Sequence, residues 1–453
     1  MLFNSYAFLL VFLPAAIAIA SVADRYPNGR RRVLIALSLI FYAYWDVRFL
    51  PLMVVSILAN WYLAKAYAAI RSGALIAAGI VGNLAVLGFF KYTNFLADNF
   101  AALGIPAGHI DVALPLGISF FTFHHVMYLV DLRGGRAPLY SLDRYALYIC
   151  YFPQAISGPL ARWSEVMDQF GQQMFRPGWE ERCAFGVTLI VLGLLQKVLL
   201  ADPVGAAVEP VFAEALKGPV IDGKSWIALG FAFQLFFDFS GYSDIAIGTA
   251  LILGVKLPQN FDAPFRATSI RDFWRRWHMT LSRFLRDYIY IPLGGNRFGL
   301  SRQIAALLAT MALGGLWHGA GWTFVIWGVL QGLAIACAVL WSRALPGPPA
   351  FVGWAATAIF SILSFVIFRA GSIEAAWHIY EGLMILPQYR LEGRNAVLAA
   401  AACAFLLPST YEICRRLTAT PQLAVPAGLG VAMVAVLVAL GESQSYQFIY
   451  FQF

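Results

Sequence analysis

Long apolar runs recur along the whole chain, and only short polar stretches separate them. The runs are continuous and do not alternate between apolar and polar positions, which favours helices over strands. An apolar helix of about 20 residues crosses a bilayer. The candidate spans are 4–22, 33–46, 48–70, 74–91, 113–131, 184–201, 226–254, 303–317, 321–341, 350–370, 396–414 and 425–441. The pattern predicts an all-α polytopic membrane protein with roughly 11–13 transmembrane helices.

Two stretches break this pattern. The segment "YFPQAISGPLARW" (151–163) is apolar but carries Pro153 and Pro159, and each proline removes a backbone donor and clashes with the preceding helical turn. We therefore expect a bent or re-entrant element that is covered by protein or lines a cavity. The segment 261–299 is too charged to span a membrane and too aromatic to be a free loop. It is predicted to form amphipathic helices at the cytoplasmic interface.

Composition agrees with this picture. Of the 453 residues, 60% are hydrophobic and 12% are charged, and the mean hydropathy is +0.70. No room is left for a sizeable aqueous domain, so we expect a single membrane domain over 1–453 that contacts the lipid bilayer. The net charge of +8 does not indicate a nucleic-acid partner, because the positive charges lie in short loops between apolar runs. The main clusters are Arg25 with Arg30–Arg32, and Arg266, Arg271, Arg275, Arg276, Arg283, Arg286 and Arg297.

The same charges predict an orientation. Under the positive-inside rule both clusters are cytoplasmic. No Lys or Arg precedes the first apolar run, which reads as a first transmembrane helix with its N-terminus outside and not as a cleaved signal peptide. Alternating the spans places the C-terminus outside as well, so 442–453 is predicted to be an extracytoplasmic aromatic tail. The five cysteines lack metal-ligand spacing, and we assign them no disulfide and no metal.

One histidine lies inside an apolar run, in "GGLWHGAGWTFVIWG" (314–328). An ionisable group at bilayer depth is a functional candidate by default. Burial favours the neutral imidazole of His318, which suits general-base work on an alcohol if the ring faces a cavity. The flanking glycines and Trp317, Trp322 and Trp327 predict either a walled cleft at a helix break or a tightly packed helix pair.

Two further groups of polar residues lie near apolar segments. Asp238 and Asp244 lie within a spanning helix, where they either pair with arginines such as Arg275 and Arg276 or line a polar path. His278 lies in "FWRRWHMTLSRFLRDYIY", with Trp274 and Ser282 expected one helical turn to either side on the same face. The adjacent arginines would hold an anionic donor such as the phosphates of coenzyme A, or anchor lipid headgroups.

At these two histidines the sequence resembles the membrane-bound O-acyltransferase (MBOAT) family, in its alginate O-acetyltransferase branch. The blocks "FWRRWHMTLSRFLRDYIYIPLGGNR" and "GGLWHGAGWTFVIWG" match the family's two signature blocks. The segments "LPLGISFFTF", "YFPQAISGPLAR", "FQLFFDFSGYSDIAIG" and "FIYFQF" match in order, so the resemblance covers almost the whole chain. His124 and His125 stand where many relatives have Gln or Glu, and we expect a structural or tunnel-lining role for them.

The resemblance implies an enzyme, an O-acetyltransferase of the bacterial inner membrane that uses acetyl-CoA as donor and binds no cofactor or metal. His318 would be the catalytic base and His278 the second signature residue, positioning the donor or stabilising the oxyanion. Donor-binding roles would fall to the neighbouring polar and aromatic side chains, namely Trp274, Arg275, Arg276, Ser282, Trp317 and Asp238. The acyl group would cross to an outward acceptor on an exported polysaccharide through a periplasmic SGNH-type partner within an export complex.

The tail "SYQFIYFQF" leaves two interpretations open. Tyr450 would be an acyl relay to the periplasmic partner, because a phenol ester is a good acyl donor; otherwise the tail is an aromatic interfacial anchor. Alternatives for the whole chain also remain at this point. They are an O-acyltransferase acting on a lipid or teichoic acid, a transporter, and a structural subunit of an export complex.

Overall fold

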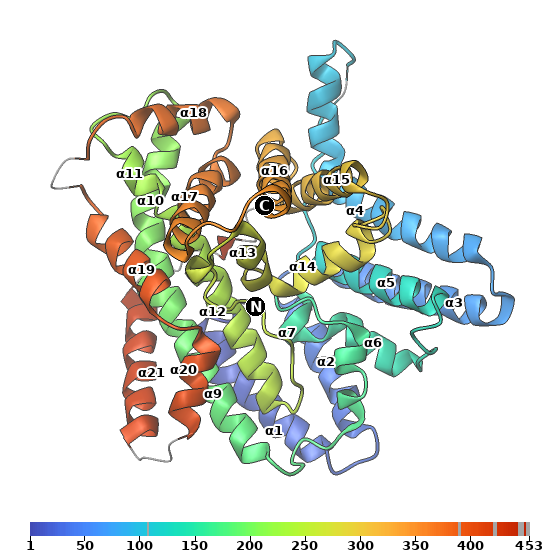
Figure 1. Ribbon diagram of the computed structural model, residues 1–453. Helices are drawn as coiled ribbons and strands as arrows, with labels where there is room; N and C mark the ends of the chain where they lie inside the picture. Colours follow the sequence, from blue (N-terminus) through green and yellow to red (C-terminus); the bar gives the residue numbers. More distant parts are fainter. Residues whose placement is uncertain (107, 388–390, 420–423, 443–447, 450–453) are drawn as a thin grey trace. The chain divides into compact units, whose positions relative to one another are not determined.

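The computed structural model describes residues 1–453 except 107, 388–390, 420–423, 443–447 and 450–453. Every regular element within the described residues is a helix (Figure 1), which confirms the predicted all-α class. The chain forms two compact units. Unit 1 comprises Met1–Ile190 and Ser243–Pro258, and unit 2 comprises Val191–Tyr242 and Gln259–Phe453.

Unit 1 is built from the N-terminal helices. They are the π-helix η1 (Ala7–Phe12), α1 (Leu13–Ala23), α2 (Gly29–Ala43), the 3-10 helix η2 (Val47–Phe49), α3 (Leu50–Ile70), α4 (Gly73–Ala102), α5 (Ile118–Arg133), α6 (Leu142–Cys150), α7 (Phe152–Ala155), α8 (Trp163–Val166) and the 3-10 helix η3 (Gln169–Gly171). Helix α9 (Trp179–Leu195) and helix α12 (Phe231–Ile252) contribute to both units. A cluster of phenylalanines fills the space between η1, α2 and α7, with the Phe41 and Phe152 ring centroids 5.2 Å apart.

Unit 2 holds both signature histidines. Its helices are η4 (π, Gln196–Ala201), α10 (Asp202–Ala215), α11 (Ser225–Ala228), η5 (3-10, Pro264–Arg266), α13 (Ile270–Arg276), α14 (Met279–Leu285), η6 (π, Arg286–Tyr290), α15 (Leu300–His318), α16 (Trp322–Ala344), α17 (Ala350–Arg369), α18 (Ile373–Gly382), α19 (Arg394–Leu406), α20 (Thr410–Ala419) and α21 (Ala424–Glu442). Helices α15 and α16 form an antiparallel pair, and α16 also packs against α17 and α13 (Figure 1).

Among the described residues, six helices are long and apolar enough to cross a membrane, or seven if one bent pair forms a single span. The multi-pass class is therefore confirmed, but this number is smaller than the predicted 11–13. The predicted spans 33–46 and 113–131 correspond to α2 and α5, which have 15 and 16 residues. A helix of that length reaches only about 24 Å, short of a hydrocarbon core of about 30 Å. Most side chains of α5 are buried in protein, and hydropathy alone does not separate that burial from contact with lipid.

Two helical segments are interrupted at prolines. The predicted bent element at 151–163 consists of the short helix α7, a bend and the start of α8, and residues 150–161 are buried. The predicted span 396–414 is a bent pair, because α19 and α20 meet at an angle of 69°. Pro408 lies in the break between them, where it cannot continue the helix.

His124 and His125 lie in α5 and are fully buried within unit 1. The hydroxyl of Ser56 donates to the carbonyl of Met53 at 2.8 Å, so it accepts from Nε2 of His125, which lies 3.3 Å away. Nδ1 of the same ring then accepts from the hydroxyl of Tyr145 at 2.6 Å. The ring therefore ties α5 to α3 and α6, which supports the structural role expected for His125.

Candidate active site

His318 is the last residue of α15, at a break between two packed helices. Gly319 and Gly321 are extended, and α16 begins at the next residue. The pair is also tightly packed. A Cβ at Gly315 would lie 2.2 Å from the Phe324 carbonyl oxygen, and one at Gly328 would lie 2.3 Å from the Met311 carbonyl oxygen. The glycines therefore form both a helix break after His318 and a tightly packed helix pair.

Aromatic rings enclose the imidazole of His318, which is only 8% exposed. Its centroid lies 4.8 Å from that of Trp317, 5.5 Å from that of Trp327 and 5.2 Å from that of Phe368 in α17. Trp322, which was predicted as a wall, is 56% exposed, so that prediction is wrong. Trp322 is the first residue of α16, and Phe368 contacts the ring instead.

Trp327 carries a buried donor. Its Nε1 has no hydrogen-bond partner among the described residues, although the side chain is 2% exposed. An indole N–H is a donor only, and a buried donor without an acceptor costs about 1–3 kcal/mol. Such an atom, next to a histidine at a helix break, needs an oxygen acceptor beyond those that the described residues provide.

His278 lies between α13 and α14 in the left-handed region, with φ 42° and ψ 53°. This backbone costs a non-glycine residue about 1–3 kcal/mol and persists only where neighbours impose it. Two backbone bonds do so here: Asp262 N donates to the Arg276 carbonyl at 2.9 Å, and Met279 N donates to the Asn260 carbonyl at 2.9 Å. The kink ends the helix at Arg276, so the predicted shared helical face of Trp274, His278 and Ser282 is wrong.

Asn260 determines the tautomer of His278. Its Oδ1 receives the backbone N–H of Thr280 at 3.3 Å and the Thr280 hydroxyl at 2.9 Å. A backbone N–H can only donate, so this atom is the amide oxygen, and the Nδ1 of His278 at 3.1 Å must donate to it. Burial lowers the pKa of His278 to about 3. The ring is therefore neutral, and its Nε2 carries the lone pair.

The ring of Trp317 lies next to both histidines. Its centroid is 6.4 Å from that of His278 and 4.8 Å from that of His318, and its side chain is 7% exposed. Phe239 of α12 contacts the His278 ring edge-on, with 4.7 Å between centroids. The two histidines that the sequence singled out, 40 residues apart, thus belong to one buried aromatic cluster.

Two of the other predicted donor-binding residues, Trp274 and Arg276, have specific partners. Trp274 Nε1 donates to Gln331 Oε1 at 3.2 Å, and Gln331 Nε2 donates to the Ser364 hydroxyl at 2.9 Å. Arg276 Nε donates to both carboxylate oxygens of Asp272 at 3.0 Å.

Arg275 and Ser282 are the remaining predicted donor-binding residues of this segment. Arg275 is exposed. The hydroxyl of Ser282 donates to the Trp277 carbonyl at 3.3 Å. Of the two arginines, Arg276 is paired with Asp272, whereas the side chain of Arg275 is exposed.

Asp238 is part of a buried ion cluster. Lys197 Nζ lies 2.5 Å from Asp238 Oδ1 and 2.7 Å from Asp202 Oδ1. The π-helix η4 carries Lys197, and Gly193 and Gly241 allow the close approach, since a Cβ at Gly241 would lie 2.6 Å from the Gly193 carbonyl. The predicted ion pair is present, but its predicted arginine partner is wrong. The pairing partner, a lysine 41 residues upstream, could not be read from local spacing.

Part of the C-terminal tail is buried in unit 2. Ile449 N donates to Asp238 Oδ2 at 3.0 Å, and the Phe448 ring stacks on Tyr242 at 4.4 Å between centroids. Phe448 also contacts Phe239, at 5.9 Å between centroids. The described part of the tail is therefore packed against the ring that contacts His278. Tyr450, the predicted relay, lies outside the described residues.

Sequence reasoning missed four residues of this site, namely Asn260, Trp327 as a donor, Gln331 and Phe368. Gln331 is the one of these that a rule would have flagged, because it is a polar residue in the middle of an apolar helix. No group of three or more His, Cys, Asp or Glu side chains that could hold a metal occurs in the part of the chain that the structure describes.

Comparison with known proteins defines the class. Residues 66–377 match the membrane-bound O-acyltransferase family. The chain is 37% identical over 424 residues to a peptidoglycan O-acetyltransferase of Helicobacter pylori, covering 85% of this chain and 80% of that protein. It is 37% identical over 409 residues to a probable alginate O-acetylase, AlgI, of Pseudomonas aeruginosa, covering 87% and 77%. A teichoic acid D-alanyltransferase of Streptococcus thermophilus is 31% identical over 238 residues, covering 50% and 57%.

The chain belongs to the membrane-bound O-acyltransferase family. It is a multi-pass membrane enzyme that transfers acyl groups, and the predicted family, fold class and enzyme class are confirmed.

Proposed function

We propose that this enzyme transfers an acetyl group from cytoplasmic acetyl-CoA to a hydroxyl group of an exported polysaccharide, in the bacterial inner membrane, with both chain ends outside. The similarity to a probable alginate O-acetylase over 87% of the chain supports a polysaccharide acceptor. The similarity to a peptidoglycan O-acetyltransferase favours a second candidate, a cell-wall polymer. The observation that carries the chemistry is His318, a buried imidazole at a helix break inside an aromatic enclosure.

In the proposed reaction His318 accepts the proton of the acceptor hydroxyl while that oxygen attacks the thioester carbonyl carbon. The new C–O bond forms, the C–S bond breaks, and the proton held by His318 passes to the departing thiolate. The products are an ester and free CoA. The apolar rings around His318 keep water away from the thioester, so hydrolysis does not compete with transfer.

The negative charge that develops on the carbonyl oxygen needs a hydrogen-bond donor. The indole N–H of Trp327 supports that role, because it is buried next to His318 and has no acceptor among the described residues. The neutral ring of His278 presents a lone pair at Nε2, so it does not suit the oxyanion role. We propose instead that His278 positions the substrate by accepting a hydrogen bond, and that Arg275 attracts the phosphates of the donor.

The acyl group then has to reach the outer acceptor. We propose that the attacking hydroxyl is the phenol of Tyr450, which loses its proton to His318 and gains the acetyl group. A periplasmic SGNH-type partner within an export complex then transfers the acetyl group to a polysaccharide hydroxyl, and the proton of that hydroxyl restores the phenol. The burial of Phe448 and Ile449 beside Asp238 and Phe239 supports a tail that reaches the site. Intact-mass analysis of the C-terminal peptide under turnover with acetyl-CoA tests the relay. An acetyl adduct that is lost in Tyr450→Phe supports it, and the absence of an adduct leaves the tail as an anchor.

The acyl donor is tested by release of CoA from purified protein in lipid nanodiscs, with acetyl-CoA and with longer acyl-CoAs. The proposal expects acetyl-CoA to give the highest kcat/KM. Preference for a long acyl chain would favour a lipid-modifying acyltransferase. Uptake of labelled substrate into vesicles without thioester cleavage would indicate a transporter, and would contradict the proposal.

A further inference from the structure

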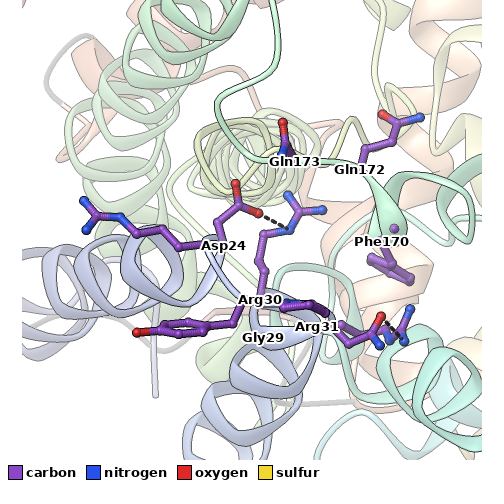
Figure 2. A pocket seen from close by; sticks show the side chains of 12 residues that line it. Asp24, Gly29, Arg30, Arg31, Phe170, Gln172 and Gln173 are labelled. Carbon is purple, nitrogen blue, oxygen red and sulfur yellow. Dashed lines mark hydrogen bonds and ion pairs between the residues drawn. The ribbon is translucent and has the colours of Figure 1, made fainter.

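A positively charged pocket lies in unit 1, remote in sequence from both histidines. It has a volume of about 310 Å³ and lies between the turn that joins α1 to α2 and the end of η3. Figure 2 shows Asp24, Arg30 and Arg31 on the first segment, with Phe170, Gln172 and Gln173 on the second. The turn is tight, because a Cβ at Gly29 would lie 2.2 Å from the Ala23 carbonyl oxygen. A side chain at this position would therefore clash with the backbone of the turn.

The charges around this pocket do not balance. Three of the described lining residues, Arg25, Arg30 and Arg31, carry a guanidinium, whereas Asp24 alone among them carries a carboxylate. The Asp24 carboxylate is already engaged, since its Oδ2 accepts the backbone N–H of Met174 at 2.8 Å. Outside the lining, Asp143 lies 2.5 Å from Arg31. An excess of positive charge remains.

Arg30 shows this excess most clearly. Its side chain is 4% exposed, and its Nη atoms donate to the carbonyls of Leu253 and Gln169 at 3.0 and 2.7 Å. Those carbonyls orient the guanidinium but carry no net charge. The Nε atom has no hydrogen-bond partner among the described residues, and the carboxylate of Asp24 is 3.7 Å away. A buried cation held in this way is stabilised by a further anion.

A second arginine lies close by. Arg176 Nη1 donates to the Gly254 carbonyl at 3.0 Å, the residue next to the Leu253 carbonyl that Arg30 binds. Burial lowers the pKa of Arg176, and the positive charge of Arg182 lowers it further. The pocket also lies at the start of α2, a 15-residue helix whose N-terminal dipole end favours an anion.

From these observations we infer that the pocket binds a phosphate group, which an anionic lipid headgroup or a soluble phosphate compound would carry. Guanidinium groups match the oxygens of a phosphate in a fixed fork geometry. Arg25 and Tyr26 line the pocket, are exposed and directly follow an apolar helix, which suits a group at the membrane surface. This inference does not depend on the proposed transfer reaction.

The test uses full-length protein with a matched pair of variants. Arg25→Gln removes an exposed arginine that lines the pocket, and Arg32→Gln removes an exposed arginine on the same segment that does not line it. In nanodiscs with phosphatidylglycerol or phosphatidylcholine, native mass spectrometry counts the lipids retained per protein. In detergent, calorimetry measures binding of 3′,5′-ADP and inorganic phosphate. Gln172→Glu places a repelling carboxylate in the pocket and serves as a second variant.

A lipid source predicts that Arg25→Gln lowers retained phosphatidylglycerol about fivefold, while Arg32→Gln changes it less than about twofold. A soluble source predicts the same difference for binding of 3′,5′-ADP or phosphate, with lipid retention unchanged. Gln172→Glu should act like Arg25→Gln in either case. Equal effects of the Arg25 and Arg32 variants, or no effect of Arg25→Gln and Gln172→Glu on any probe, would overturn the inference.

Discussion

Asn260 accepts a hydrogen bond from Nδ1 of His278 at 3.1 Å, and this contact places the lone pair of the ring on Nε2. Replacing Asn260 with Leu removes the acceptor and frees the ring to take the other tautomer. We expect kcat to fall about tenfold to a hundredfold, with a smaller change in KM for acetyl-CoA. Asn260→Asp keeps an oxygen acceptor and should retain most of the activity. Equal losses in the Leu and Asp variants would show that Asn260 only supports the fold.

The left-handed backbone of His278 gives a second prediction, which separates its ring from its backbone. Asparagine tolerates this conformation better than alanine does, so His278→Asn should fold while lacking the ring. We expect it to lose activity about a hundredfold with a melting temperature near that of the wild type. His278→Ala should also lose stability, because alanine is strained at φ 42°. Full activity in folded His278→Asn would rule out a role for the ring.

The buried indole of Trp327 is predicted to donate to the carbonyl oxygen in the transition state. Trp327→Phe keeps an aromatic ring but removes the N–H, and kcat should fall about a hundredfold. Trp341→Phe is the control on the same helix, since that side chain is 49% exposed and its Nε1 donates to the nearby Pro346 carbonyl. The rate of CoA release measures both variants. Equal rates in the two variants would contradict an oxyanion role for Trp327.

The Lys197 cluster predicts a large effect on stability. Lys197→Met leaves Asp202 and Asp238 buried without their cation, which costs about 3–5 kcal/mol. Arg276→Met, by contrast, breaks an ion pair whose side chains are 34% and 27% exposed, and such a pair contributes about 0–1 kcal/mol. Thermal unfolding in detergent should therefore separate the two variants clearly. Equal melting temperatures would mean that the buried charges are not paired as described.

The low pKa of His278, about 3, predicts acid sensitivity. An imidazole of the unfolded chain takes up a proton below about pH 6.5, whereas the folded ring stays neutral. The buried neutral ring of His278 therefore contributes fully to the free energy of unfolding above about pH 6.5, and this contribution is lost as the pH falls toward 3. Because the two proteins are expected to melt at similar temperatures near pH 7, the melting temperature of the wild type should fall below that of His278→Asn between pH 7 and pH 5. If the melting temperatures of the two proteins change with pH in parallel, protonation of this ring does not differ between the folded and unfolded states, which would contradict the prediction.

The sequence predicted much of what is local along the chain. The helical class followed from apolar runs, the irregular segment at 151–163 from its prolines, and the break after His318 from its glycines. These features depend on the residues themselves and their immediate neighbours. Among the described residues, fewer helices have the length and apolarity of a membrane span than the sequence predicted, because an apolar helix such as α5 is buried by protein as readily as by lipid.

The features that the sequence did not predict depend on distant parts of the chain. Phe368 contacts His318 from 50 residues away, and Lys197 replaces the expected arginine partner of Asp238. The left-handed turn at His278 is imposed by backbone bonds from the loop at 260–262, so helical spacing alone misplaced Trp274 and Ser282. Physical rules identify which polar residues need a partner, but the packing decides which partner they obtain.

The central claim is that His318 is the base of the transfer reaction. It is tested most directly by the rate of CoA release from acetyl-CoA in nanodiscs, wild type against His318→Ala, at matched amounts of inserted protein. The account predicts a loss of at least about a hundredfold in kcat, with a melting temperature close to that of the wild type. A His318→Ala enzyme that is correctly inserted and releases CoA at the wild-type rate would contradict it.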